Sequence, residues 1–187
     1  MNHATAPVSV RKIWHWLVVH PSMDVVLILS AGLAVGVSLA RDYGLSWDEY
    51  TNQVYARDTI GAYLGVRSPD DTLMDLKYYG PAFNVAWLIA RNLIARLVPN
   101  LRPTDAGHFI YFLSFLAGVI FFYSLARRIA GRGAGVTAVL IFVTQPAVLG
   151  HAFVNPKDIP FMTSSWRPCG LASAQEIRWP AARRCPL

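Results

Sequence analysis

The protein has 187 residues, of which 54% are hydrophobic and 15% are charged, and its mean hydropathy is +0.35. An average soluble domain is about 45–50% apolar and about 25% charged, so this composition disfavours an ordinary soluble domain and favours contact with lipid. The net charge of +6 does not indicate a nucleic-acid-binding protein, because the basic residues flank apolar segments instead of forming a patch interleaved with aromatic residues. Basic residues beside membrane spans more often set topology and meet anionic lipid.

The first apolar segment follows a polar, basic stretch over residues 1–23 that contains no acid. Residues 25–40 carry no charge, and with the apolar residues just before them they predict a first membrane span over about 17–40. A cleaved signal peptide is the alternative, since Ser38-Leu39-Ala40 weakly resembles a cleavage site. The length and late start of the apolar stretch favour a retained span.

A polar segment over residues 41–106 comes next, with eight acids and seven bases. Within it, residues 83–98 have apolar side chains near helical spacing and predict an amphipathic helix. Arg91 and Arg96 make this helix a poor membrane span. It suits the membrane interface, and a helix buried within the loop is the alternative.

Two further apolar segments are separated by a short basic stretch. Residues 109–126 and 134–150 contain no charge, and the residues between them include Arg127, Arg128 and Arg132 around two glycines. We therefore expect membrane spans over about 108–126 and 134–150, joined by a tight basic turn.

The positions of the basic residues predict the orientation of the chain. With three spans, Arg11 and Lys12 lie on the same side of the membrane as the basic turn, as the positive-inside rule requires. A fourth span over residues 83–98 would put the two basic clusters on opposite sides. The sequence thus predicts an all-α integral membrane protein of the inner membrane with three transmembrane helices and a cytoplasmic N-terminus. Interfacial amphipathic helices would lie in the outward loop over residues 41–106.

The composition changes again near the C-terminus. Residues 164–187 hold four Arg, three Pro and both cysteines, with no apolar period. A helix that begins near Ile159 is expected to stop by Thr163. We predict that residues 1–163 are the N-terminal part of a larger polytopic membrane domain and that residues 164–187 are an unrelated or frameshifted, disordered tail. A native basic tail is the alternative, and reading the coding DNA in the other frames separates the two.

The acidic pair Asp48-Glu49 lies a few residues after the first predicted span. A carboxylate at the bilayer surface can act as general base on an acceptor hydroxyl, and a neighbouring acid can bind a metal or keep the site polar. The simpler interpretation is a helix N-terminus, with Ser46 as the cap and both acids in the first turn. The two interpretations are compatible.

Two other residues could contribute to such a site. Asp158 lies between Pro156 and Pro160 directly after the third predicted span, and we expect it at the same membrane level as Asp48. A charged helix cap is the alternative. Lys77, in the segment Lys77-Tyr78-Tyr79-Gly80-Pro81, could contact a phosphate as a point charge. The tyrosines beside it are typical interface anchors.

In their order and sidedness, these motifs resemble those of membrane glycosyltransferases of the GT-C type. The resemblance is closest to the group that contains dolichyl-phosphate-mannose protein mannosyltransferases and aminoarabinose transferases. It covers residues 24–163 and rests on Asp48-Glu49, on the segment from Lys77 to Pro81, and on the acid near proline at Asp158. The chain differs from the aminoarabinose branch at Tyr79-Gly80, where relatives often have an acid and a further lysine.

The resemblance implies transfer of a sugar from a polyprenyl-phosphate donor to a hydroxyl of a protein or glycolipid acceptor at the outer membrane face. Asp48 would be the general base, Glu49 and Asp158 would support it or hold a divalent cation, and Lys77 would contact the donor phosphate. Because such enzymes have many more spans, we expect the 187-residue chain alone to be inactive.

Two other classes of protein compete with the glycosyltransferase. A non-catalytic small membrane protein, such as a subunit or assembly factor, would use the same acids only to cap helices. A transporter fragment is disfavoured, because transporters place functional charges inside their spans and the predicted spans have none at their centres.

Overall fold

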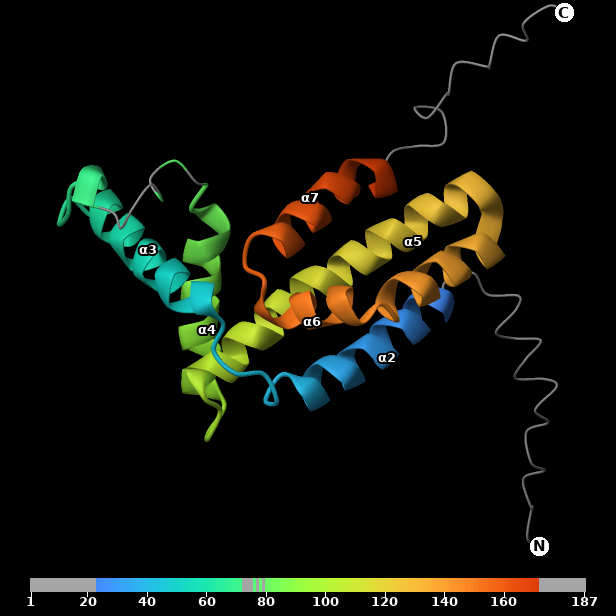
Figure 1. Cartoon of the computed structure of the whole chain (residues 1–187), viewed down its shortest axis with the longest axis horizontal. Helices are drawn as coiled ribbons and strands as arrows, with labels where there is room; N and C mark the ends of the chain where they lie inside the picture. Colours follow the sequence, from blue (N-terminus) through green and yellow to red (C-terminus); the bar gives the residue numbers. More distant parts are fainter. Residues whose placement is uncertain (1–22, 72–75, 77, 79, 172–187) are drawn as a thin grey trace, which may run out of the picture.

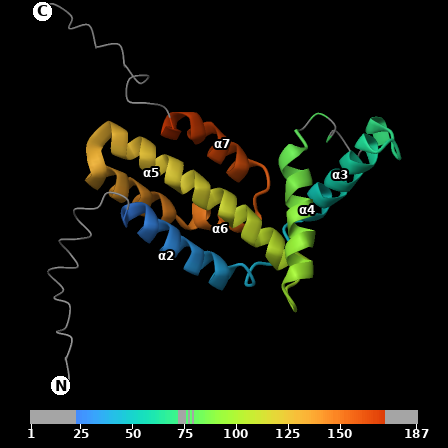
Figure 2. The same cartoon turned by 180° about the vertical axis from the view of Figure 1, so that it is seen from behind.

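The computed structural model describes residues 23–71, 76, 78 and 80–171. Every regular element in these residues is helical and none is a strand, which confirms the all-α prediction. Helices α2, α5, α6 and α7 lie side by side along the long axis, and α3 and α4 pack at one end (Figures 1 and 2). The elements are α2 (Met23–Leu39), α3 (Trp47–Tyr63), the 3-10 turn η1 (Pro69–Asp71), α4 (Ala82–Leu97), α5 (Pro103–Val143), α6 (Pro146–Val154) and α7 (Asp158–Leu171).

Helix α5 is a hairpin of two helical arms. The backbone leaves helical geometry at Gly131, where φ is 87° and ψ is 178°. A positive φ is readily accessible only to glycine, so the chain reverses here and the second arm runs back beside the first (Figure 1). The reversal lies within the basic stretch at which the sequence predicts a turn between two helices.

The third predicted span is wrong as a single helix over residues 134–150. The second arm of α5 ends at Val143, and α6 begins at Pro146 after an extended Gln145. Proline lacks a backbone N–H and disfavours helical geometry in the residue before it, which explains the break. Among the described residues, α5 alone is long and apolar enough to cross a membrane, so the structure carries one such helix and the three spans remain a prediction.

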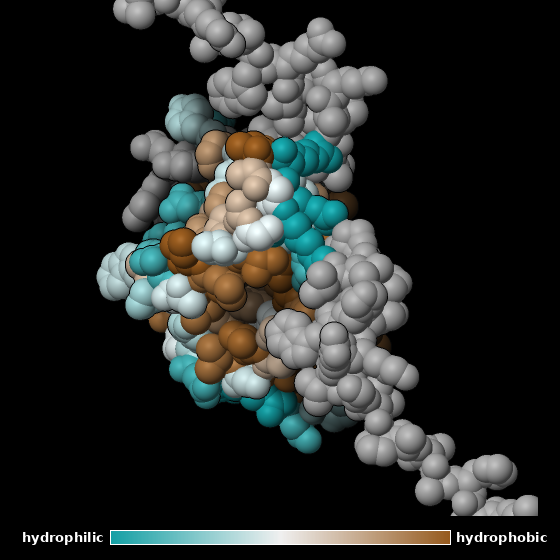
Figure 3. Space-filling view, turned by 90° about the vertical axis from the view of Figure 1, so that its right-hand side faces the viewer, coloured by the Kyte–Doolittle hydropathy of each residue, from teal (hydrophilic) through white to brown (hydrophobic). Residues whose placement is uncertain are grey.

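Helix α2 covers the described part of the first predicted span, of which residues 17–22 lie outside the described residues. It is apolar on all sides and packs on α5 through a glycine face, yet many of its apolar side chains are exposed. Such a helix is typical of a lipid environment, because in water it would be buried all round. Figure 3 shows apolar residues gathered on one end face of the molecule, bordered by hydrophilic ones. The exposed large apolar side chains of α2 are Val26, Leu27, Leu29, Leu33, Val35 and Val37.

The contact between α2 and α5 depends on a glycine. A Cβ atom added at Gly36 would lie 2.5 Å from Cδ1 of Phe112, which is 2% exposed and held in the core. Phe112 cannot move aside easily, because its ring stacks on that of Phe153 at a centroid distance of 4.6 Å. The absence of a side chain at Gly36 is therefore what lets the two helices approach.

We expect Gly36→Ala to destabilise the fold by about 1–3 kcal/mol, the usual cost of overpacking a filled core. Gly133→Ala is the matched control, because a Cβ there would meet nothing within 4 Å. Unfolding by denaturing detergent, followed by circular dichroism, measures both variants. Equal stability of the two variants would contradict the close α2–α5 contact.

An ion pair joins the start of α2 to the α5 turn. Both terminal oxygens of Asp24 accept hydrogen bonds from Arg132, at 2.6 Å from Nη2 and 2.7 Å from Nε, and the Tyr123 hydroxyl donates a third at 2.6 Å. The first residues of α2 and the basic turn therefore lie at the same end of the helix bundle, opposite α3 and α4 (Figure 1).

Helix α7 corrects the expectation that helical order ends near Thr163. The helix runs to Leu171, and the Ser164 and Ser165 hydroxyls each donate to the Phe161 carbonyl at 2.8 Å. Trp166 stacks on Phe122 of α5 at 4.9 Å, so this segment packs on the bundle instead of being disordered. Tertiary packing stabilises a helix that lacks a clear apolar period. Residues 172–187 lie outside the described residues, and the frameshift stays a prediction.

Candidate functional site

Helix α3 begins with the acidic pair. Ser46 has extended geometry before the first turn, which contains Asp48 and Glu49, so the helix N-terminus proposed for these residues is present. Ser46 does not cap the helix with its side chain, however. Its hydroxyl donates to the Val154 carbonyl at 3.4 Å and so connects the start of α3 to the end of α6. Two acids in a first turn interact favourably with the positive end of the helix dipole.

The two acids have opposite environments. Asp48 has 55% of its side chain exposed, and its Oδ2 lies 3.9 Å from Nζ of Lys157. Glu49 is 2% exposed. Successive residues on a helix point about 100° apart, so one carboxylate can face solvent while its neighbour faces the core. Only Asp48 is accessible to a substrate.

Glu49 is held by a histidine of α5. Its Oε2 lies 3.2 Å from Nε2 of His108, whose side chain is fully buried, and Nδ1 of the same ring lies 3.3 Å from the Ala40 carbonyl oxygen. Both ring nitrogens thus face an oxygen. The contacts are satisfied by an imidazolium facing a carboxylate, or by a neutral ring donating from Nδ1 and accepting from a protonated Glu49.

A buried arginine and two aromatic rings complete this interior cluster. Arg91 of α4 lies over the Trp87 ring at 4.9 Å, and its Nη1 donates to Gln53 at 3.2 Å. Burial lowers the pKa of Arg91, and the negative charge of Glu49 acts in the opposite direction. Tyr111 stacks parallel to Trp87 at 5.2 Å. Helices α3, α4 and α5 are therefore joined by a polar interior cluster with aromatic walls.

Asp158 begins α7, as the helix-cap alternative requires. Asn155 Oδ1 accepts from the backbone N–H groups of Lys157 at 3.1 Å and Asp158 at 2.9 Å, and its Nδ2 donates to Asp158 Oδ2 at 2.9 Å. This turn presents Lys157 to Asp48 across the start of α3. Asp48 and Asp158, which are far apart in the sequence, thus flank the same lysine.

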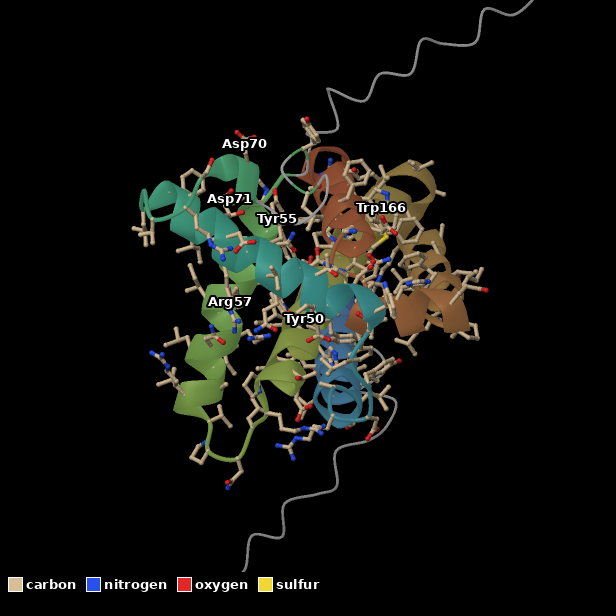
Figure 4. All side chains as sticks on the ribbon, turned by 60° about the vertical axis from the view of Figure 1, so that its left-hand side comes forward. Tyr50, Tyr55, Arg57, Asp70, Asp71 and Trp166 are labelled. Atoms are coloured by element: carbon tan, nitrogen blue, oxygen red, sulfur yellow. The ribbon has the colours of Figure 1, made fainter. Side chains whose placement is uncertain are left out.

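A cavity of about 590 Å³ opens beside these residues, between α3, the start of α4 and the start of α7. Asn52 reaches it from α3 and donates through Nδ2 to the Asp48 carbonyl at 2.7 Å. Figure 4 shows α3 at the front of the molecule, with Tyr50 and Tyr55 labelled along it. Tyr55 is buried and lines the cavity, whereas Tyr50 is exposed. The remaining lining residues are Leu76, Gly80, Phe83, Asn84, Pro156, Lys157, Asp158, Pro160, Phe161 and Ser164.

The other predicted contributions to the site are not settled by the described residues. Lys77 and Tyr79 lie outside them. Within the part of the chain that the structure describes, no three His, Cys, Asp or Glu side chains are grouped to hold a metal ion, and the divalent cation stays a prediction.

Sequence reasoning did not select His108, Asn52 or Asn84. His108 is one of five histidines scattered along the sequence, and no motif distinguishes Asn52 or Asn84 from the other asparagines. The one available signal was His108 itself, a titratable residue at the start of an otherwise uncharged run.

Comparisons with protein-family models, with curated proteins and with solved structures found no match.

Proposed function

We propose that the protein takes part in the transfer of a sugar from a polyprenyl-phosphate donor to an acceptor hydroxyl at the outer face of a membrane. The observation that supports this most is the exposed carboxylate of Asp48, whose Oδ2 lies 3.9 Å from Nζ of Lys157, a residue that lines the cavity together with Asp158. The order of motifs from residue 24 to 163 supports the same reaction class by resemblance.

In the proposed reaction, Asp48 accepts the proton of the acceptor hydroxyl while the oxygen of that hydroxyl attacks the anomeric carbon of the donor sugar. A carbon–oxygen bond to the acceptor forms, the bond to the phosphate oxygen breaks, and polyprenyl phosphate leaves. A general base of this kind must be open to the substrate, and Asp48 is. Lys157 joins Lys77 as a candidate to contact the departing phosphate, since a lysine can bind phosphate as a point charge.

Glu49 takes a different part in this proposal from the one that the sequence suggested. Its carboxylate is buried against His108, so we assign it to positioning the first turn of α3 and not to contact with substrate or metal. Asp158 is exposed on the cavity side and remains a candidate for supporting Asp48.

The proposed membrane placement puts the basic α5 turn on the cytoplasmic side of the inner membrane and α3 and α4 outside. The exposed apolar side chains of α2 and the long apolar α5 support membrane insertion. Arg127, Arg128 and Arg132 support the orientation, because basic residues favour the cytoplasmic side. The N-terminus would then be cytoplasmic as well.

The reaction is tested with membranes that contain the chain together with any longer product of the same coding region. Radiolabelled polyprenyl-phosphate hexose and polyprenyl-phosphate pentose are supplied separately with peptide and glycolipid acceptors. We expect label in one acceptor, with release of polyprenyl phosphate, and none from membranes without the protein. Absence of transfer from both donors would refute the proposal.

A non-catalytic membrane subunit is the second candidate. It is favoured by the contacts of Glu49 and Asp158, which join helices and begin α7 without any need for a substrate. Under this alternative the protein co-purifies with a larger membrane complex, and changing Asp48 leaves the activity of that complex unaltered.

A further inference from the structure

Two asparagines of the cavity wall have unsatisfied acceptors. Asn52 is 1% exposed and Asn84 is 7% exposed, and Oδ1 of each has no hydrogen-bond partner among the described residues. Leaving one buried acceptor unpaired costs about 1–3 kcal/mol, so two in one wall are unusual for a purely structural surface. The Asn52 amide is held by the bond from its Nδ2 to the Asp48 carbonyl, whereas the broad terminal amide torsion of asparagine allows the Asn84 oxygen to turn toward a ligand in the cavity.

The chemistry of the lining restricts what the cavity can hold. Both unpaired atoms are acceptors, so the ligand must donate hydrogen bonds. The charged lining residues are Lys157 and Asp158, which balance each other, so a neutral ligand is favoured over an ion. Inorganic phosphate or a phosphate ester carries acceptors and negative charge, and therefore suits the asparagine oxygens poorly.

Aromatic side chains supply the other part of the lining. Tyr55, Phe83 and Phe161 border the same cavity as the two asparagines. An apolar ring face beside a few fixed polar groups is the usual composition of a small-molecule site. A saturated ring that bears hydroxyl groups offers C–H surface to the aromatic rings and O–H donors to the asparagines.

We propose that this cavity binds a neutral, hydroxyl-bearing ring, with Asn52 and Asn84 as the hydroxyl-recognising residues. The inference deepens the proposed function and rests on it for the identification of the ring as a substrate sugar. Asn52 also contacts the backbone of Asp48, so the ring would lie next to the candidate base. The phosphate of a donor would then be bound outside the asparagine wall.

Binding is tested on the whole chain in phosphatidylcholine nanodiscs, without glycoside detergents that would compete. Saturation-transfer NMR is recorded with methyl hexosides and methyl pentosides, and phosphorus NMR with inorganic phosphate. We expect saturation of the ring protons of at least one glycoside and no binding of phosphate at the same concentration. Binding of phosphate alone, or of nothing, overturns the inference.

The asparagines are tested by Asn52→Leu and Asn84→Leu, each of which removes the acceptor at similar volume. Each is expected to weaken glycoside binding about tenfold. Asn92→Leu on the exposed face of α4 is the control and should bind like wild type. Asn84→Asp keeps an oxygen acceptor and should retain more binding than Asn84→Leu. This comparison at one position distinguishes loss of the acceptor from a folding defect. Equal binding by all four variants overturns the assignment.

The binding measurements test the proposed sugar site independently of the proposed transfer reaction. Glycoside binding that depends on Asn52 and Asn84, without any sugar transfer by the membranes, would leave the binding site standing and refute the proposed function. Sugar transfer without glycoside binding in the nanodiscs would refute the proposed binding site and leave the proposed function standing.

Discussion

Asp48→Asn is expected to lower sugar transfer by about 10²–10⁴-fold, the usual contribution of a general base. The substitution keeps the size of the side chain and removes its ability to accept a proton. Because Asp48 is exposed and hydrogen-bonds through its backbone carbonyl to Asn52, the loss of its charge should leave the fold intact. Transfer from the polyprenyl-phosphate donor is measured in membranes that contain equal amounts of each protein.

Asp42→Asn is the matched control for this substitution. Asp42 is an exposed acid on the connection that precedes α3, whereas Asp48 lies in the first turn of that helix, and the change at Asp42 should leave transfer near the wild-type rate. Normal transfer by Asp48→Asn would remove Asp48 as the base and favour the non-catalytic subunit. An equal loss in both variants would point to a general surface-charge effect.

His108→Leu is expected to destabilise the protein by about 1–3 kcal/mol, the cost of leaving a buried polar group without its hydrogen-bond partner. Glu49 would lose the contact at 3.2 Å and stay enclosed at 2% exposure. Its Oε1 already has no partner among the described residues, so the carboxyl group would be left without a hydrogen bond there. Unfolding in mixed micelles, followed by circular dichroism, measures the loss.

The double variant His108→Leu with Glu49→Leu tests whether the unpaired acid causes the loss of stability in His108→Leu. Replacing both members of a buried pair by apolar residues is often neutral, so most of the lost stability should return. His151→Leu, at an exposed histidine of α6, should cost little. If the double variant is as unstable as His108→Leu, the loss comes from packing and not from the unpaired acid. The double variant should also show altered transfer if Glu49 positions Asp48.

The local elements were accessible from the sequence. Charge-free segments indicated helices at α2 and in both arms of α5, and apolar spacing indicated α4 to within one residue at each end. Glycine within the basic stretch indicated the reversal at Gly131. The acids after Ser46 indicated the start of α3. These features depend on side-chain periodicity and backbone preferences over a few residues, which a sequence records directly.

The composition of the candidate site was decided by tertiary contacts. Glu49 and His108 are 59 positions apart, and nothing near either residue distinguishes a buried pair from two surface residues. Asn52 and Asn84 line one cavity only because α3 and α4 pack against each other and face the start of α7. The sequence by itself therefore determined the helical character of the chain and the place of Asp48-Glu49 at a helix start. Which acid is accessible, and what lies beside it, depends on the packing of distant helices, because burial is a property of the assembled fold and not of local spacing.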